Sequence, residues 1–257
     1  MLNHKNIKVL FGSTLILLSM ASFFMEIKWL VFFLVLFTWL SITIWGSFDI
    51  RSNYFTKSYC KGESLDKKIA ITFDDGPTLI TNDVLDILKK HKAKATFFCI
   101  GTQIENHPDI FKKIIEEGHL IGNHSYSHDK GIGFFSTLKV VQEIQKNDLV
   151  IEKYLGRKTQ LFRPPFGVTN PRFARAIKQT GHFVIGWNNR SLDTVIDDDN
   201  KILKRITEKI NPGGIVLLHD TSSKTTRVLE QLLLLLQTEN YIVTPLDELL
   251  NIKAYEN

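Results

Sequence analysis

Two aspartates stand side by side where an apolar run ends, Asp74 and Asp75 in the stretch TFDDGP. An aspartate before Gly-Pro is ordinary turn chemistry, so either one alone would need no further explanation. Successive residues of a strand point to opposite faces, and a pair can serve one site only if a turn or bulge redirects the chain. The pair therefore indicates either turn chemistry or two separate jobs in one site.

Two histidines four residues apart, His124 and His128 in the stretch NHSYSH, follow a later apolar run. This spacing predicts two imidazoles on one side of a helical turn, a common way to hold a metal, although two surface histidines would show it too. Asp75 is the available carboxylate for a third ligand. Two histidines and an aspartate leave a position for water, as catalytic zinc sites do. Nitrogen and oxygen ligands also suit cobalt, nickel or manganese.

Three more polar side chains follow predicted strand ends. Arg163, in LFRPPFG, keeps its proton there, so it must pair with a carboxylate or meet an anionic ligand. His219, after four apolar residues in IVLLHD, is well placed as a proton donor, although a capped surface histidine is the alternative. Asp193, in NNRSLDT, could orient such a histidine and is otherwise a loop aspartate.

These residues need elements that bring distant strand ends together. After residue 66 the chain alternates segments of helical spacing with short apolar runs rich in β-branched and aromatic residues. Seven runs are typical of strands: KIAITF, KATFFCI, HLIGNH, QLFRPP, HFVIGWN, GGIVLLH and YIVTPL. Such alternation predicts an α/β protein whose parallel sheet is closed or nearly closed into a barrel, with its chemistry at the carboxyl ends of the strands.

The stretches TFDDGP, NHSYSH, FRPPFG and IVLLHD, in this order, resemble the motifs of polysaccharide deacetylases with a NodB-homology domain, carbohydrate esterase family 4. The resemblance covers residues 67–250 and implies a distorted (β/α)7 barrel of the TIM type. It implies an enzyme that removes N-acetyl groups from amino sugars and uses one divalent metal, with zinc the first choice and cobalt, nickel or manganese possible.

The resemblance also implies a role for each candidate residue. The metal ligands would be Asp75, His124 and His128. Asp74 would be the general base that takes a proton from the attacking water, and Arg163 would hold it in place. His219 would be the general acid that protonates the leaving amine, and Asp193 would orient it.

A pocket for the acetyl group follows from the same resemblance. Trp187 and Leu217 would be walls around its methyl group, and the backbone N–H of Phe166 would help to stabilise the oxyanion. The family often has tyrosine where this chain has Phe166. Thr194 stands where tryptophan commonly follows the acid, and Arg190 lies in the same loop, which suggests a differently shaped substrate groove.

The first fifty residues are strongly apolar. Residues 9–25 and 29–48 carry no charge, and the second segment reaches the roughly 20 residues that a helix needs to cross a bilayer. We expect a membrane hairpin over residues 1–50, a connector over 51–66, the deacetylase domain over 67–250 and a tail over 251–257. A cleaved signal peptide for the first segment and a buried hairpin of a soluble domain are the alternatives.

The charge pattern does not decide on which side of the membrane the C-terminal domain lies. Lys5, Lys8, Arg51 and Lys57 flank the hairpin and outnumber Lys28 in its loop, so the positive-inside rule puts both ends in the cytoplasm. A single span would put the C-terminal domain outside. Outside, peptidoglycan or an envelope polysaccharide would be the substrate; inside, it would be a lipid-linked sugar. A bacterial cytoplasmic membrane is expected in either case.

Composition narrows the function classes further. The formal net charge is +5, and three of these charges belong to residues 1–57, so no basic patch indicates nucleic acid as a partner. Cys60 and Cys99 are too few for a cysteine-based zinc site or a disulfide framework. O-acetyl ester hydrolysis at the same site and a catalytically silent carbohydrate-binding barrel remain as alternatives to N-deacetylation.

Overall fold

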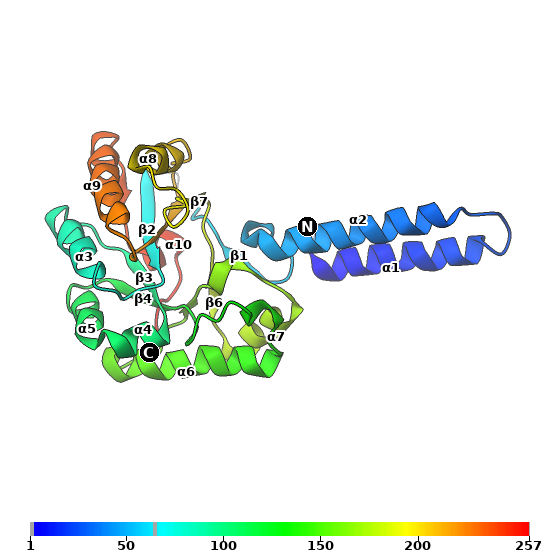
Figure 1. Cartoon of the computed structure of the whole chain (residues 1–257), viewed down its shortest axis with the longest axis horizontal. Coiled ribbons are helices and arrows are strands. Elements are labelled where there is room, and N and C mark those ends of the chain that lie inside the picture. The colour runs from blue at the N-terminus through cyan, green and yellow to red at the C-terminus, as the bar shows by residue number, and fades with distance from the viewer. Residues whose placement is uncertain (1–2, 64–65, 257) are drawn as a thin grey trace.

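The protein is built around a curled parallel sheet, shown in the computed structural model of Figure 1. The structure describes residues 3–63 and 66–256. Residues 1–2 of the expected anchor, 64–65 of the expected connector and 257 of the expected tail lie outside the described residues.

The sheet has nine strands in the described part of the chain, in the order β1-β6-β5-β4-β3-β2-β8-β7, with β9 also paired to β2. The strands are β1 (Ser58–Tyr59), β2 (Lys68–Asp74), β3 (Thr96–Cys99), β4 (Leu120–Asn123), β5 (Leu161–Phe162), β6 (Phe183–Ile185), β7 (Asn189–Arg190), β8 (Gly214–His219) and β9 (Ile242–Val243). Only residues 186–188 separate β6 from β7, yet β7 pairs with β8 at the far end of the order. The sheet must therefore curl back on itself, which confirms the predicted distorted barrel.

Two strands were not among the seven predicted ones. β1 falls within the range expected to be a connector and pairs with β6, and β7 is a two-residue strand. Both are too short to show an apolar period of their own.

Helices cover the outside of the curled sheet (Figure 1). They are α3 (Thr81–Lys90), α4 (Gly101–Asn106), α5 (Pro108–Glu116), α6 (Thr137–Leu155), α7 (Pro171–Thr180), α8 (Asp199–Thr207), α9 (Ser223–Thr238) and α10 (Leu246–Leu250). Three 3₁₀ turns connect elements: η1 (Ile50–Ser52), η2 (Ile132–Phe134) and η3 (Pro165–Gly167).

Strand β2 shows how the core and the site share one element. Ile69, Ile71 and Phe73 are buried in the largest hydrophobic cluster, together with residues of α3 and α9. Because side chains alternate along a strand, Thr72 and Asp74 point the other way, into the barrel. Both are buried polar residues, which need partners inside the barrel.

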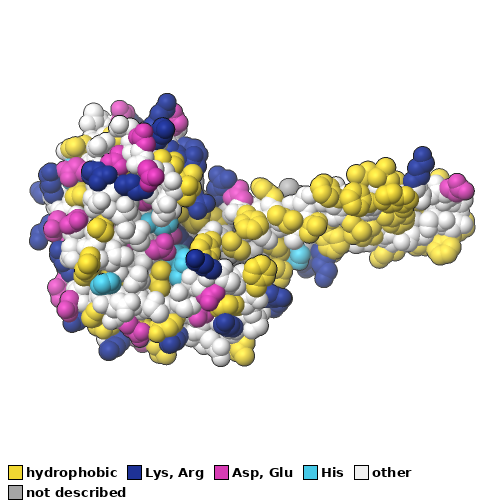
Figure 2. Space-filling model, in the orientation of Figure 1, with side chains coloured by type: hydrophobic (Ala, Val, Ile, Leu, Met, Phe, Trp, Pro, Cys, Tyr) yellow, Lys and Arg dark blue, Asp and Glu magenta, His cyan; other side chains and the backbone are white. Residues whose placement is uncertain are grey.

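A helical hairpin, α1 (His4–Ala21) and α2 (Trp29–Phe48), projects from the body (Figures 1 and 2). The rings of Phe11 and Trp39 stack between the helices at 6.2 Å. Among the described residues, α2 is the one helix long and apolar enough to cross a membrane, with a mean hydropathy of 2.0. Helix α1 begins before the predicted apolar segment and takes in the polar residues His4, Lys5 and Lys8.

Candidate active site

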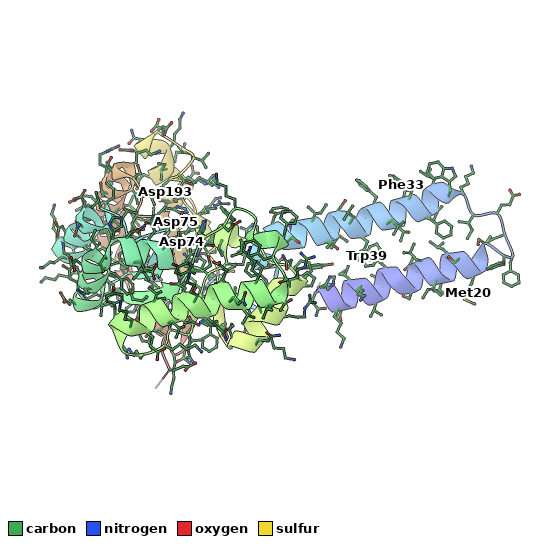
Figure 3. All side chains as sticks on the ribbon, turned by 60° about the horizontal axis from the view of Figure 1, so that its bottom comes forward. Met20, Phe33, Trp39, Asp74, Asp75 and Asp193 are labelled. Atoms are coloured by element: carbon green, nitrogen blue, oxygen red, sulfur yellow. The ribbon has the colours of Figure 1, made fainter. Side chains whose placement is uncertain are left out.

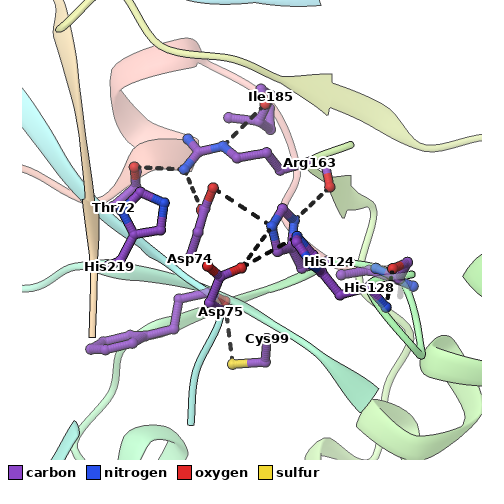
Figure 4. Close-up of polar contacts among 12 residues, drawn as sticks. Thr72, Asp74, Asp75, Cys99, His124, His128, Arg163, Ile185 and His219 are labelled. Atoms are coloured by element: carbon purple, nitrogen blue, oxygen red, sulfur yellow. Dashed lines mark hydrogen bonds and ion pairs between the residues drawn. The ribbon is translucent and has the colours of Figure 1, made fainter. Parts of the chain in front are cut away.

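Three potential metal ligands converge at the mouth of the barrel (Figure 4). The ligand atoms of Asp75, His124 and His128 all lie within 4.8 Å of one another, the one such group found in the described residues. Asp75 Oδ1 lies 3.4 Å from Nε2 of each histidine and is buried without a hydrogen bond. A tetrahedral ion with ligand distances of about 2.1 Å puts its ligands about 3.4 Å apart. The donor set and its spacing therefore fit a divalent metal.

Unusual backbone conformations aim these side chains. Asp74 is the last residue of β2, and Asp75 has a φ of 73°, a conformation uncommon for a residue with a Cβ. The chain thereby turns so that both carboxylates reach His124: its Nε2 lies 3.8 Å from Asp74 Oδ2 and 3.4 Å from Asp75 Oδ1. The two aspartates of the pair do share one site (Figure 3).

The predicted helical turn between the two histidines is wrong. Residues 124–128 form an irregular loop after β4, in which Ser125 and His128 have φ values of 64° and 49°. A left-handed residue cannot continue a right-handed helix. The two rings still come together, with centroids 4.9 Å apart, because the loop doubles back.

The hydrogen bonds and charges around Asp75, His124 and His128 favour the binding of a metal cation. His124 Nδ1 lies 2.7 Å from the carbonyl oxygen of Arg163, which places the ring proton on Nδ1 and leaves Nε2 free to bind a metal. Burial opposes a charge on His124, but the nearby Asp74 and Asp75 more than offset it and raise its pKa, so this point of the barrel attracts positive charge. Burial and the neighbouring His124 lower the pKa of His128 to about 4, which keeps its ring neutral and able to bind.

Arg163 holds Asp74 from inside the barrel. Its guanidinium is fully buried and donates to Asp74 Oδ1 at 2.6 Å and to Thr72 Oγ1 at 2.9 Å. The remaining nitrogens donate to the carbonyl oxygens of Ile185 and Gly186. Each nitrogen of the guanidinium thus donates a hydrogen bond, and Oδ1 of Asp74 is fixed while its Oδ2 faces His124 (Figure 4).

His219 stands opposite Asp74, because the two residues are register partners in the β2–β8 pair. Its Nδ1 lies 2.7 Å from Asp193 Oδ1, and its backbone N–H donates to Asp193 Oδ2 at 2.8 Å. Burial opposes the imidazolium, but the hydrogen bond and charge of Asp193 outweigh it and raise the pKa of His219 to about 9. Ser191 and Thr225 donate further hydrogen bonds to Asp193, which is fully buried.

The three residues predicted for the acetyl pocket lie near this group. Phe166, in η3, has a φ of 59° and is half exposed, and its ring centroid lies 4.7 Å from that of His128. Trp187 packs against Gly167, where a Cβ would collide with the indole. Leu217 is buried on β8, two residues before His219 and therefore on the same face of the strand.

Some supporting residues were not singled out from the sequence. Asp220 is buried beside the DDGP turn, accepts a hydrogen bond from Thr81 Oγ1 at 2.5 Å, and lies where a Cβ on Gly76 would be. Burial raises its pKa to about 7. Its place directly after His219 in IVLLHD was the available signal. Thr72 had a signal too, because it precedes Asp74 by two residues on the same face of β2.

A second buried network holds the histidine loop from behind. Asn123 Oδ1 accepts hydrogen bonds from Ser125 N and Asn147 Nδ2, and Asn123 Nδ2 donates to Asp148 Oδ1. Asn147 Nδ2 also donates to the carbonyl oxygen of Cys99 at 2.9 Å. Helix α6 thus joins the ends of β3 and β4, directly before the loop that carries the potential metal ligands His124 and His128.

Comparison with known proteins identifies the class of this barrel. A family model described as polysaccharide deacetylase matches residues 61–185. The peptidoglycan-N-acetylglucosamine deacetylase of Bacillus cereus is 34% identical over 194 residues, which cover 73% of this chain and 90% of that protein. The chain belongs to the polysaccharide deacetylase family, as its four motifs predicted.

Two further relatives define the extent of the similarity. Peptidoglycan-N-acetylglucosamine deacetylase PgdA of Listeria monocytogenes is 35% identical over 184 residues, which cover 71% of this chain but only 39% of that protein. A crystal structure of the Bc1960 peptidoglycan N-acetylglucosamine deacetylase superposes with a TM-score of 0.74 at 26% identity, over 77% of this chain and 95% of that one. The shared part is the barrel, and the projecting hairpin precedes the matched region.

Proposed function

We propose that this protein is a membrane-anchored, metal-dependent hydrolase that removes N-acetyl groups from amino sugars of a bacterial envelope glycan. The observation that carries the proposal is the arrangement at the barrel mouth. Asp74 and His219 lie side by side as register partners on parallel strands, and the potential ligand group Asp75, His124 and His128 lies beside Asp74. The relatives named above act on N-acetylglucosamine of peptidoglycan, which supports an N-acetylated hexosamine as substrate.

Asp75, His124 and His128 would hold one divalent ion, with zinc the first choice and cobalt, nickel or manganese as alternatives. When bound, such an ion lowers the pKa of water and polarises a carbonyl oxygen. Asp75 is available as an ionised ligand, because its contacts with the two histidines outweigh burial and lower its pKa.

The protein's own side chains then divide the proton transfers. Asp74 takes a proton from the attacking water, and the buried Arg163 keeps this carboxylate oriented. His219, held by Asp193, gives a proton to the nitrogen of the leaving amine. The C–N bond breaks, and the products are acetate and a free amino group on the sugar.

The remaining residues fit the acetyl group and the oxyanion. The backbone N–H of Phe166 would donate to the oxygen that becomes negatively charged. Trp187 and Leu217 would enclose the methyl group and exclude water from it. An amide is a weak electrophile, and these contacts act where charge develops in the transition state.

Helix α2 would anchor the protein in a bacterial cytoplasmic membrane. It has the length and composition of a membrane span, and most of its large apolar side chains are exposed; Figure 2 shows apolar side chains along the visible face of the hairpin. Trp29 at one end and Trp45 near the other are typical of residues at the two bilayer interfaces.

The proposal is tested with the purified full chain and oligomers of N-acetylglucosamine. We expect release of acetate together with one free amine per acetate, loss of both on treatment with a chelator, and recovery on addition of zinc. An enzyme that stays fully active after its metal content has fallen to zero would contradict the metal-dependent part of the proposal.

A further inference from the structure

The end of helix α2 is fixed to the catalytic body. Thr169 N donates to the carbonyl oxygen of Ser47 at 3.0 Å, and Gly46 packs so closely on the ring of Tyr54 that a Cβ would collide. Ile50, in η1, is buried with residues of β5 and α7. A helix with the length of a membrane span therefore runs directly into the barrel, and would hold it at the bilayer surface.

A cavity of about 350 Å³ opens at this junction, which we call the junction pocket. Its charged lining residues are Asp49, Arg51, Arg190, Arg205 and Lys209. Trp187, Trp45 and Phe48 supply its aromatic walls. Figure 2 shows Lys and Arg side chains gathered where the hairpin meets the body.

Most of the positive charge in the junction pocket lacks a counter-charge. Arg51 pairs with Asp49 at 2.8 Å. Within the described residues, the side chains of Arg190, Arg205 and Lys209 form no ion pair with a carboxylate. Three unpaired cations around one cavity repel each other, and an anion with more than one charge would relieve that repulsion. Guanidinium groups match the geometry of phosphate oxygens in particular.

The junction pocket adjoins the catalytic residues through Trp187. Arg190 lies over the indole of Trp187, with its guanidinium carbon 5.7 Å from the ring centroid. The indole of Trp187 also packs against Gly167. The carbonyl oxygen of Gly186, the residue before Trp187, accepts a hydrogen bond from Arg163. A sugar attached to a phosphate in the junction pocket would extend past Trp187 toward Asp74.

With α2 in a bilayer, the junction pocket would lie at the level of the lipid phosphate groups. It lies where α2 ends, beside Trp45 and the exposed Phe48, and aromatic side chains of this kind mark the headgroup level of a bilayer. Phe48 also borders an apolar groove lined by Phe134, Phe166 and Val168. Charged and apolar surfaces thus meet at one point, as the phosphate and hydrocarbon parts of a lipid do.

We propose that the substrate is an N-acetylated amino sugar carried on the phosphate or diphosphate of a membrane lipid, with the phosphate bound in the junction pocket. This inference rests on the proposed N-deacetylase function and names its substrate class. Arg190, Arg205 and Lys209 bind the anion, and Trp187 separates it from the acetyl group.

The test compares two substrates for the full chain in phosphatidylcholine vesicles: N-acetylglucosaminyl phosphoryl polyprenol and the soluble tetramer of N-acetylglucosamine. The variant is Arg190→Gln with Lys209→Gln, because both side chains are exposed and donate no hydrogen bond to the protein in its described part. We expect its kcat/KM to fall at least about tenfold more for the lipid phosphate than for the tetramer, chiefly through KM. The matched control is Lys201→Gln, an exposed residue on the same helix as Arg205. It should change the ratio of kcat/KM for the lipid phosphate to kcat/KM for the tetramer by less than about twofold.

Equal effects on both substrates, or no effect on either, would overturn the proposal. Inhibition of sugar-lipid deacetylation by an equal concentration of phosphatidylglycerol would also overturn the proposal. The junction pocket would then be a general site for anionic lipids. A wild type that acts on the tetramer but not on the sugar lipid would overturn the substrate class and leave N-deacetylation standing.

A binding measurement separates the two proposals if no acetate is released at all. The Asp74→Asn protein, with and without Arg190→Gln and Lys209→Gln, is mixed with the sugar lipid in detergent and examined by native mass spectrometry. Retention of the lipid that depends on the two cations supports the junction pocket even if the deacetylase proposal fails. No retention, or retention independent of them, overturns it.

Discussion

Asp74 and Asp75 are neighbours in the chain but have different partners in the site. Asp74 is tied to the buried Arg163, whereas Asp75 faces two imidazoles and has an oxygen without a hydrogen bond. The positive φ of Asp75 makes this division possible, because it turns the second carboxylate toward the first. One acid is thus free to move a proton while the other is free to bind a cation.

Replacement of Asp193 by asparagine should change the pH profile more than the fold. Asp193 offsets the burial of His219 and raises its pKa to about 9. His219 must be protonated to act as an acid, so the rate falls as the pH rises through that pKa. Without the carboxylate charge the pKa falls, and we expect the alkaline limb of kcat to move to lower pH by about 1–3 units.

The matched control for this change is Asp197→Asn, an exposed aspartate that pairs with Lys224 at the surface. It should leave the alkaline limb where it is in the wild type. An alkaline limb that stays fixed in Asp193→Asn would mean that His219 does not govern it.

The candidate site residues were predictable from the sequence. The residues that hold them in place were predictable only in part. Four motifs contain the three candidate metal ligands, Asp74, Arg163 and His219, and each motif lies at the end of an apolar run. Asp193 was named as an acid that could orient a histidine, and the resemblance implied that this histidine is His219; the two side chains lie 2.7 Å apart. Thr72 and Asp220 are ordinary polar residues in the sequence, and only the folded barrel shows that Thr72 accepts a hydrogen bond from Arg163 and Asp220 accepts one from Thr81.

At the scale of elements, helix α6 stabilises the loop that carries the candidate metal ligands His124 and His128. Asn147 is fully buried and bridges the end of β3 to Asn123 at the end of β4. Asn147→Ala would remove one of the hydrogen bonds that the Cys99 carbonyl and Asn123 Oδ1 each accept, and would leave a gap among buried polar groups. We expect the free energy of unfolding to fall by about 1–3 kcal/mol in denaturant titrations.

The same variant should bind zinc about tenfold more weakly, measured by competition with a chelator, because the loop that presents His124 and His128 is loosened. Gln145→Ala, an exposed residue of α6, is the control and should change neither quantity. Unchanged zinc affinity in a measurably destabilised Asn147→Ala protein would show that α6 supports the fold without positioning the site.

Strands that are marked by an apolar run in the sequence were predicted well. Strands that form only because they pair with a strand distant in the sequence were not. The run KIAITF was predicted as a strand and forms most of β2, whose Ile69, Ile71 and Phe73 pack in the largest hydrophobic cluster. Strands β1 and β7 consist of two residues each and exist because β6 and β8 lie beside them. The loop 124–128 was expected to be a helical turn because spacing alone cannot reveal the left-handed residues Ser125 and His128.

At the scale of the whole molecule, the hairpin returns the chain to the side where it began. The backbone N–H of His4 donates to the carbonyl oxygen of Tyr54, so the start of α1 and the end of α2 lie together. If both helices cross the bilayer, the catalytic body and the N-terminus share one side. Lys5, Lys8 and Arg51 favour the cytoplasm for that side.

A reporter attached after Asn257 should therefore report a cytoplasmic C-terminus in intact cells. A reporter active only outside the membrane should stay silent at the same position. An outside C-terminus would mean that one helix spans alone and would direct the search for substrates to exported glycans.

The central claim is that this chain is a hydrolase in which one aspartate moves a proton and its neighbour holds a metal. The most direct measurement compares acetate release and zinc content of purified wild type and Asp74→Asn. We predict a loss of turnover of at least about a hundredfold with zinc content unchanged, whereas His124→Ala should lose both. Turnover within a few-fold of wild type in Asp74→Asn, or loss of zinc together with turnover, would contradict the account.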